Sequence, residues 1–145
     1  MLDKANGEYI AIQDHDDLRH PEKLVKQVNF LMQHPELLGC GTKTLMRYEN
    51  DHKGFEYFLG PLTMQALHPS LMFRNDGTAR YPENVYMNDA LFQKKVLCKG
   101  KRRLIANLDE TLTLHRIRAE AQNYSYSWFQ CNKQNIQTIF YLHPL

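Results

Sequence analysis

Apolar residues change their spacing along the chain in a way that predicts short strands alternating with helices. A continuous apolar run at residues 9–12 lies between Gly7 and an acidic cluster, which is typical of a strand that is buried on both faces. After Pro21 the apolar residues recur at helical spacing, and the helix has to end before Pro35. The apolar stripe of this helix consists of Leu24, Val28, Leu31 and Met32. The acidic cluster is therefore expected at the carboxyl end of a buried strand, just before a helix.

A two-residue alternation over residues 38–48 predicts a longer strand. Turn-forming residues at 50–54 follow it, so the apolar residues at 55–58 are expected to pair back onto it. The remaining elements are predicted, in chain order, as a short helical segment at 62–67, a strand at 70–74, a turn at 75–77, a helix at 88–98, two edge strands at 104–106 and 111–115, and a helical tail at 119–141.

These elements predict an α/β fold with a mixed sheet and flanking helices. A chain of 145 residues, 43% of them hydrophobic, can bury one core, and no repeat or linker divides it. A single domain is therefore expected.

Charge and cysteine usage narrow the classes of partner and compartment. The net charge of +2 is too close to balance to predict a nucleic-acid groove or a polybasic membrane anchor. The three cysteines are widely spaced and include no CxxC pair, so they suggest neither a disulfide framework nor a structural zinc site and favour a reducing, cytoplasmic location. Residues 1–8 do not resemble a signal peptide, and no apolar run is long enough for a transmembrane segment.

The acidic cluster of Asp14, Asp16 and Asp17 carries the candidate chemistry. Three carboxylates within four residues repel one another, and a divalent cation with oxygen ligands relieves that repulsion. Mg²⁺ and Mn²⁺ are the expected ions, because they bind one or two protein carboxylates and share the rest of their coordination sphere with water and phosphate oxygens. Taken alone, the cluster fits a solvated turn equally well. A metal-dependent phosphohydrolase is disfavoured, because the further His and Asp clusters that it needs are absent from the sequence.

The sequence around the acids resembles the Asp-x-Asp segment of inverting family 2 glycosyltransferases, which have a GT-A fold. The resemblance begins with Gly7-Glu8-Tyr9-Ile10-Ala11-Ile12-Gln13-Asp14-His15-Asp16-Asp17 and continues with His20-Pro21-Glu22-Lys23-Leu24 and Gln27-Val28. Downstream, residues 68–74, the pair Asn88-Asp89 and residues 112–116 also resemble family segments, with Asn88 where the family usually has Glu and His115 where Tyr is common.

The resemblance implies a partial GT-A (Rossmann-like) fold. Residues 1–118 would be the C-terminal portion of a GT-A domain and residues 119–145 a helical tail of the same domain. The family's first βαβ half, which holds the nucleotide, has no counterpart here. Losing neighbouring strands leaves a sheet edge uncovered, so we expect a dimer or a partner chain at that edge.

The resemblance also implies roles for individual residues. Asp14 and Asp16 would bind Mn²⁺ or Mg²⁺, Asp17 would support them and contact substrate, and Asp89 would be the catalytic base. The further substrate-binding candidates are His68, Asn88 and Arg116. The donor would be a nucleotide-diphosphate sugar, with a UDP-sugar as first choice, and the acceptor a saccharide or lipid-linked hydroxyl in polysaccharide biosynthesis.

Each role has a structural alternative. Asp89 could cap the helix that begins there, and His68 before Pro69 could be a hydrogen-bonded structural residue. Lys23 is expected on a solvated helix face. The aromatic residues of the tail, including Trp128, fit core packing better than an acceptor platform or a peripheral contact with the inner face of the membrane. The whole chain could also be a truncated, non-catalytic remnant that needs a partner chain to bind the donor.

Overall fold

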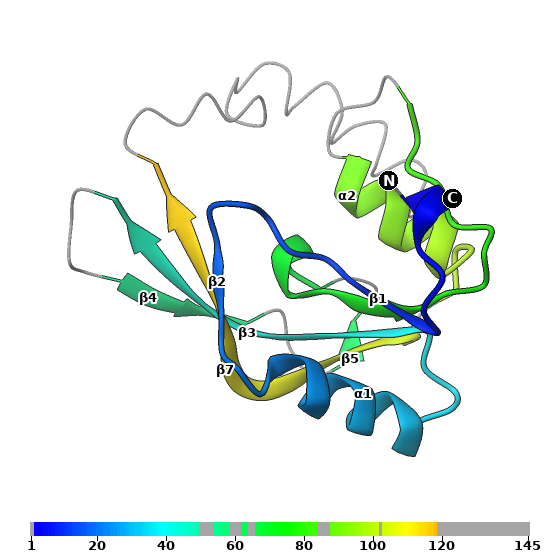
Figure 1. Cartoon of the computed structure of the whole chain (residues 1–145), viewed down its shortest axis with the longest axis horizontal. Helices are drawn as coiled ribbons and strands as arrows, with labels where there is room; N and C mark the ends of the chain where they lie inside the picture. Colours follow the sequence, from blue (N-terminus) through cyan, green and yellow to red (C-terminus); the bar gives the residue numbers. More distant parts are fainter. Residues whose placement is uncertain are drawn as a thin grey trace, which may run out of the picture.

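A computed structural model of the chain describes residues 2–49, 54–58, 62–63, 66–83, 88–101 and 103–118. In this part of the chain a mixed sheet lies between helices on its two faces (Figure 1). The strands are β1 (Tyr9–Ala11), β2 (Leu18–Arg19), β3 (Gly39–Tyr48), β4 (Gly54–Tyr57), β5 (Leu62–Thr63), β6 (Met72–Arg74) and β7 (Ile105–Ile117). The helical segments are η1 (Leu2–Lys4), α1 (Lys23–Gln33), η2 (His68–Ser70), α2 (Asn88–Leu91) and the π-helix η3 (Phe92–Leu97).

The strand order is β1-β6-β3-β7-β2, with β4 pairing with β3 and β5 pairing with β7. Among the described strands only the central pair, β3 and β7, is parallel, and the other pairs are antiparallel. The prediction of an α/β fold with a mixed sheet is confirmed, and the curled sheet is compatible with a Rossmann-like arrangement.

Strand β7 corrects the prediction of two edge strands at 104–106 and 111–115. These residues belong to one 13-residue strand with β3 on one side and β2 and β5 on the other. The register between β3 and β7 shifts on both sides of Lys43, where Asp109 and Glu110 bulge outward and are exposed. Because this bulge interrupts the two-residue alternation, the sequence pattern predicted two separate strands instead of one.

Strand β1 forms as predicted, but it is not buried on both faces. Tyr9 and Ile10 are half-buried and Ala11 is exposed. In the described part of the chain β1 pairs with β6 alone, as the end strand of the sheet. An apolar run at a sheet edge cannot be told from one at its centre by sequence alone, which explains the error.

Helix α1 confirms the predicted helix, because it ends at Gln33, before Pro35. Its buried face differs from the prediction. Met32 is 66% exposed, whereas Lys23, expected in solvent, is only 1% exposed. Burial lowers the pKa of Lys23 to about 8. Gln27 is also buried, and its side-chain amide donates hydrogen bonds to the carbonyl oxygens of Cys40, at 3.2 Å, and Ser70, at 2.9 Å.

Two clusters of buried apolar side chains cover the faces of the sheet. The cluster on the side of α2 and η3 contains Ala66, Leu71, Phe73, Ala79, Phe92, Leu97, Cys98 and Ile105. The cluster on the side of α1 contains Leu31, Leu37, Cys40, Met72, Ala106 and Leu108. Neighbouring residues Met72 and Phe73 enter opposite clusters, as the pleat of a strand buried on both faces requires.

Of the predictions for the shorter elements, some are confirmed and others are wrong. The hairpin of β3 and β4 and the turn at 75–77 are confirmed, the turn having Gly77 at φ +72° with its N–H bonded to the Asn75 side chain. The helical segment predicted at 62–67 is wrong at its start, where Leu62 and Thr63 form strand β5. The strand predicted at 70–74 begins two residues later, after the turn η2. The helix at 88–98 is confirmed, with a π-helical second half. The predicted tail at 119–145 lies outside the described residues.

Candidate functional site

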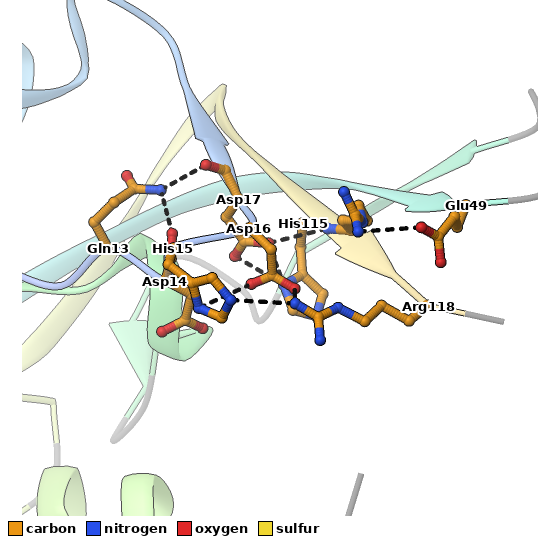
Figure 2. A network of polar contacts seen from close by, with 9 residues as sticks. Gln13, Asp14, His15, Asp16, Asp17, Glu49, His115 and Arg118 are labelled. Atoms are coloured by element: carbon orange, nitrogen blue, oxygen red, sulfur yellow. Dashed lines mark hydrogen bonds and ion pairs between the residues drawn. The ribbon is translucent and has the colours of Figure 1, made fainter. Parts of the chain in front are cut away.

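The acidic segment forms a loop between β1 and β2, and this loop lies against the second half of β7 (Figure 2). The backbone N–H of Ile12 donates to the carbonyl of Leu71, the residue before β6, at 2.9 Å, which fixes the start of the loop. Gln13 then closes the loop on itself, because its side-chain amide donates to the carbonyl oxygens of Asp14, at 3.1 Å, and Asp17, at 3.0 Å. The carboxylates are thus held on a short, cross-braced segment at the carboxyl end of β1, as expected from the sequence.

Asp17 is the most enclosed of the three acids, with a side chain that is 0% exposed. Its two carboxylate oxygens lie 3.0 and 2.9 Å from Nδ1 of His115, and the backbone N–H of Arg116 donates to one of them at 3.0 Å. A buried carboxylate needs such partners, because an isolated buried charge is costly. These contacts fix the loop to β7 and give Asp17 a structural part in the site.

Asp14, Asp17 and His115 form a candidate metal-binding group. Each offers one ligand atom, and these atoms all lie within 4.8 Å of one another. Burial raises the pKa of Asp14, the Asp17 and Asp16 charges add to the rise, and His68 and His115 oppose it. A cation between these residues would offset both the burial and the repulsion. Carboxylate oxygens together with an imidazole are a donor set that fits a divalent ion.

Asp16, predicted as a metal ligand together with Asp14, is not a member of this group in the structure. Its carboxylate forms an ion pair with Arg118 at 2.8 Å and lies 3.9 Å from Nδ1 of His15 (Figure 2). Partial burial acts to raise the pKa of Asp16, but its own backbone N–H and the Arg118 charge lower that pKa below its ordinary value. The metal role of Asp16 stays a prediction.

Tyr81 is a half-buried side chain that contacts His68, a predicted substrate-binding residue. Burial raises its pKa to about 12, and the charges of Asp89 and Asp14 contribute to the rise. His68 contacts the same side chain, with Nε2 3.1 Å from the Tyr81 hydroxyl, and its charge acts on Asp14. That Asp14, His68 and Asp89 belong to one site stays a prediction.

The geometry bears on the structural alternatives, a helix cap for Asp89 and a structural hydrogen bond for His68. Asp89 is the second residue of α2, so the capping position lies before it. His68 does form a structural hydrogen bond, to Tyr81, but its Nδ1 is buried and accepts or donates no hydrogen bond within the described part of the chain. A buried ring nitrogen without a partner is unusual for a purely structural histidine.

The other two predicted substrate contacts are less informative. Asn88 opens α2, but the structure does not describe its side chain. Arg116 contributes its backbone N–H to Asp17, whereas its guanidinium pairs with Glu49 at 3.1 Å. The roles of both in substrate binding stay predictions.

Two residues of the site were missing from the predicted set. His115 points to the same face of β7 as Thr113, which the two-residue alternation of the strand indicates. The alternation does not show that this face meets the acidic loop. Tyr81 stacks on Phe92 with ring centroids 4.2 Å apart, yet it lies in a stretch without hydrophobic periodicity. Only the tertiary fold shows that Tyr81 belongs to the site.

Comparisons with known proteins connect the chain to sugar transfer. It is 24% identical to the amylovoran biosynthesis glycosyltransferase AmsE of Erwinia amylovora over 143 aligned residues, which cover 88% of this chain and 52% of that protein. It is 49% identical over 45 residues to EpsE of Bacillus subtilis (strain 168), whose name assigns it provisionally to the glycosyltransferases; this match covers 31% of the chain and 16% of EpsE. No protein-family model matches. The chain thus spans about half the length of AmsE and a smaller part of EpsE.

None of the helices in the described residues is both long enough and apolar enough to cross a membrane.

Proposed function

We propose that this chain is the acceptor-side portion of an inverting glycosyltransferase, which moves a sugar from a nucleotide-diphosphate donor to an acceptor hydroxyl with the help of a divalent cation. The observation that carries the proposal is that Asp14, Asp17 and His115 place their ligand atoms within 4.8 Å of one another. The similarity to two proteins named as glycosyltransferases supports it.

The donor side of the reaction would use the acidic loop. Asp14 and Asp16 are the proposed ligands of Mn²⁺ or Mg²⁺, to which the geometry adds Asp17 and His115 as further donors. Such an ion, when bound, neutralises the charge that develops on a leaving diphosphate. Asp17 also keeps the loop in place through its contacts with β7, so Asp14 can remain aimed at the donor. We propose a UDP-sugar as this donor.

The acceptor side would use Asp89. A carboxylate that takes a proton from the acceptor hydroxyl as that oxygen attacks the anomeric carbon contributes roughly 100- to 10,000-fold in rate. His68 and Tyr81, which contact each other, would orient the acceptor, and Asn88 and Arg116 are further proposed substrate contacts. Attack opposite to the leaving diphosphate inverts the configuration at the anomeric carbon.

The acceptor is proposed to be a saccharide or a lipid-linked saccharide of polysaccharide biosynthesis, the process that the name of AmsE also gives. A cytoplasmic site, with peripheral contact at the inner face of the membrane, fits such an acceptor. The outer edge of β1 has no partner strand among the described residues, and we propose that a second copy or a partner chain covers it and completes the donor site.

A second candidate is a non-catalytic remnant. The chain spans about half of AmsE, so the activity of that whole protein is not carried over to it in this case. In that case the chain would retain the acidic loop but bind a nucleotide sugar only together with a partner chain.

Calorimetric titration of the chain with a UDP-sugar, with and without Mn²⁺, tests the proposal. We expect binding that requires Mn²⁺ and is lost in Asp14→Asn and Asp16→Asn. Binding by Asp16→Asn alone would assign the ion to Asp14, Asp17 and His115. Equal UDP-sugar binding by the wild type with and without Mn²⁺ would refute the metal-assisted mechanism. Binding only after a partner chain is added would favour the remnant.

A further inference from the structure

Three exposed aromatic side chains lie together on the hairpin of β3 and β4, and we call them the aromatic surface: Tyr48, Phe55 and Tyr57. They are 47%, 46% and 38% exposed. The rings of Tyr48 and Phe55 are in contact, with centroids 6.3 Å apart and planes tilted by 44°. Clustered exposed aromatic residues on a rigid sheet mark an interaction surface more often than isolated ones do.

The strand register places this surface on the same face of the sheet as His115. Met46 pairs with Phe55 in β4 and with His115 in β7, and Thr44 pairs with Tyr57. Residues paired across neighbouring strands point to the same face. Since neighbouring strands are about 4.8 Å apart, Phe55 lies about 10 Å from His115 across the sheet. The aromatic surface is thus continuous with the candidate metal-binding group.

The opposite face of the same hairpin is charged. There Lys43 forms ion pairs with Glu56 at 3.3 Å and with Asp109 at 2.6 Å, and Thr111 also bonds to Glu56. Among the described residues of the hairpin, the face that carries the aromatic surface has only Thr44 and Met46 beside the three aromatic side chains. An anionic polymer or an anionic lipid surface is attracted by basic residues, and the described part of this face has none, so the chemistry points to an uncharged ligand.

The size of the aromatic surface argues against a protein partner. A fully buried Tyr or Phe covers about 150–250 Å², so three rings that are less than half exposed offer about 250 Å². A stable protein interface needs about 800 Å² on each side. A narrow ligand that lies along the sheet fits this area better.

We propose that the aromatic surface binds the saccharide chain of the acceptor, roughly two sugar rings away from the hydroxyl that reacts. The apolar faces of sugar rings pack on flat aromatic rings, and the phenol groups of Tyr48 and Tyr57 can hydrogen-bond with sugar hydroxyls. This inference rests on the proposed function, because that function places the donor's diphosphate at Asp14 and His115, and the acceptor has to approach the donor sugar next to it. It adds that the acceptor's saccharide chain is uncharged, and it names the side chains that bind it.

The test measures binding of neutral hexasaccharides (maltohexaose, cellohexaose and galactohexaose) to the full chain by saturation-transfer NMR. At least one is expected to bind to the wild type, with an affinity that falls roughly tenfold in Phe55→Ala and in Phe55→Leu. Leucine preserves an apolar side chain but removes the flat ring. Val25→Ala is the matched control, because Val25 is 55% exposed on α1, and its affinity should equal that of the wild type.

The outcomes separate this inference from the proposed function. If no hexasaccharide binds, or if Phe55→Leu binds as the wild type does, the saccharide surface is refuted. Loss of phospholipid-vesicle binding or of self-association in Phe55→Ala, with hexasaccharide affinity unchanged, would refute it as well. If Phe55→Ala loses hexasaccharide affinity although the wild type binds no UDP-sugar with Mn²⁺, the aromatic surface stands and the proposed transferase function fails.

Discussion

The two halves of the central strand pair have different surroundings although they belong to the same two strands. In the first half, residues 39–42 of β3 and 105–108 of β7 are buried, and the apolar clusters cover both faces. In the second half, residues 44–48 and 113–117 become progressively exposed and carry His115, the partner of the acidic loop. The register shift around Lys43 separates the halves. One strand pair therefore provides rigidity at one end and a functional surface at the other.

The largest expected effect comes from adding volume to the buried half. A Cβ at Gly41 would lie 2.2 Å from Oδ1 of Asn107 and 2.4 Å from Cβ of Ala66. Because Cβ of Ala66 cannot move away without shifting its backbone, we expect Gly41→Val to lower the free energy of unfolding by about 3 kcal/mol or more. Urea denaturation measures this. Gly7→Ala is the control, since its new Cβ meets nothing closer than 3.4 Å, and an equal loss in both variants would contradict the comparison.

Removing the partner of His115 tests the functional half. Asp17→Ala leaves the His115 ring and the Arg116 N–H without their acceptor, which should cost about 2 kcal/mol of unfolding free energy. We also expect the Mn²⁺-dependent binding to disappear, because the acidic loop loses its attachment to β7. The control is Asp16→Ala, which removes an ion pair with the half-exposed Arg118 and should change stability by about 0.5 kcal/mol or less. Equal stability losses would show that Asp17 has no special structural part.

Local patterns were sufficient for elements whose burial is decided by near neighbours. The helix α1, the strand β3, its hairpin partner β4 and the turn at Asn75 were all predicted, because amphipathic spacing and turn residues determine them. The burial of Gln27 was not predictable, since its partners, the Cys40 and Ser70 carbonyls, lie 13 and 43 residues away.

For the candidate site, too, sequence reasoning predicted the local part but not the long-range contacts. A local motif identified the acids, but His115 reaches Asp17 across 98 residues of chain. Its contact with Asp17 depends on the pairing of β2 with β7, and a strand of two residues such as β2 has no recognisable pattern. Sequence reasoning therefore located the loop and missed the surface on which it rests.

The buried charge of Lys23, beside the first half of β3, leads to a prediction of the opposite sign: its removal should stabilise the protein. The pKa of Lys23 is lowered to about 8, so between about pH 8 and its ordinary value of 10.5 the unfolded chain binds more protons than the folded one. Stability should therefore rise with pH over this window. Lys23→Met removes the buried charge, so we expect about 1 kcal/mol of stabilisation at pH 7 and a smaller rise above pH 8. Lys101→Met, at an exposed position, should leave stability at pH 7 unchanged.

Chemical denaturation at pH 7 and pH 9.5 distinguishes the two variants. A Lys23→Met protein that is less stable than the wild type at pH 7 would mean that the packing of the aliphatic stem of Lys23 contributes more to stability than the desolvation of its ammonium group costs.

The smallest expected effect on stability is at Asp14, the counterpart of Lys23 in the functional half. Burial raises the pKa of Asp14, so the folded chain binds more protons than the unfolded chain just above the ordinary value of 3.8, and stability falls as pH rises through that window. Asp14→Asn should therefore be slightly more stable than the wild type at pH 7 in the absence of metal. With Mn²⁺ the order should reverse, because an ion that binds only the folded wild type raises its melting temperature. Thermal denaturation with and without Mn²⁺ measures both effects.

The matched control is Asp76→Asn. The Asp76 carboxylate lies in an exposed turn with Thr78, so Mn²⁺ should raise the melting temperature of this variant as much as that of the wild type. If Mn²⁺ raised the melting temperature of Asp14→Asn as much as that of the wild type, the ion would have to bind elsewhere, and the contrast between a core end and a metal-binding end of the strand pair would be wrong.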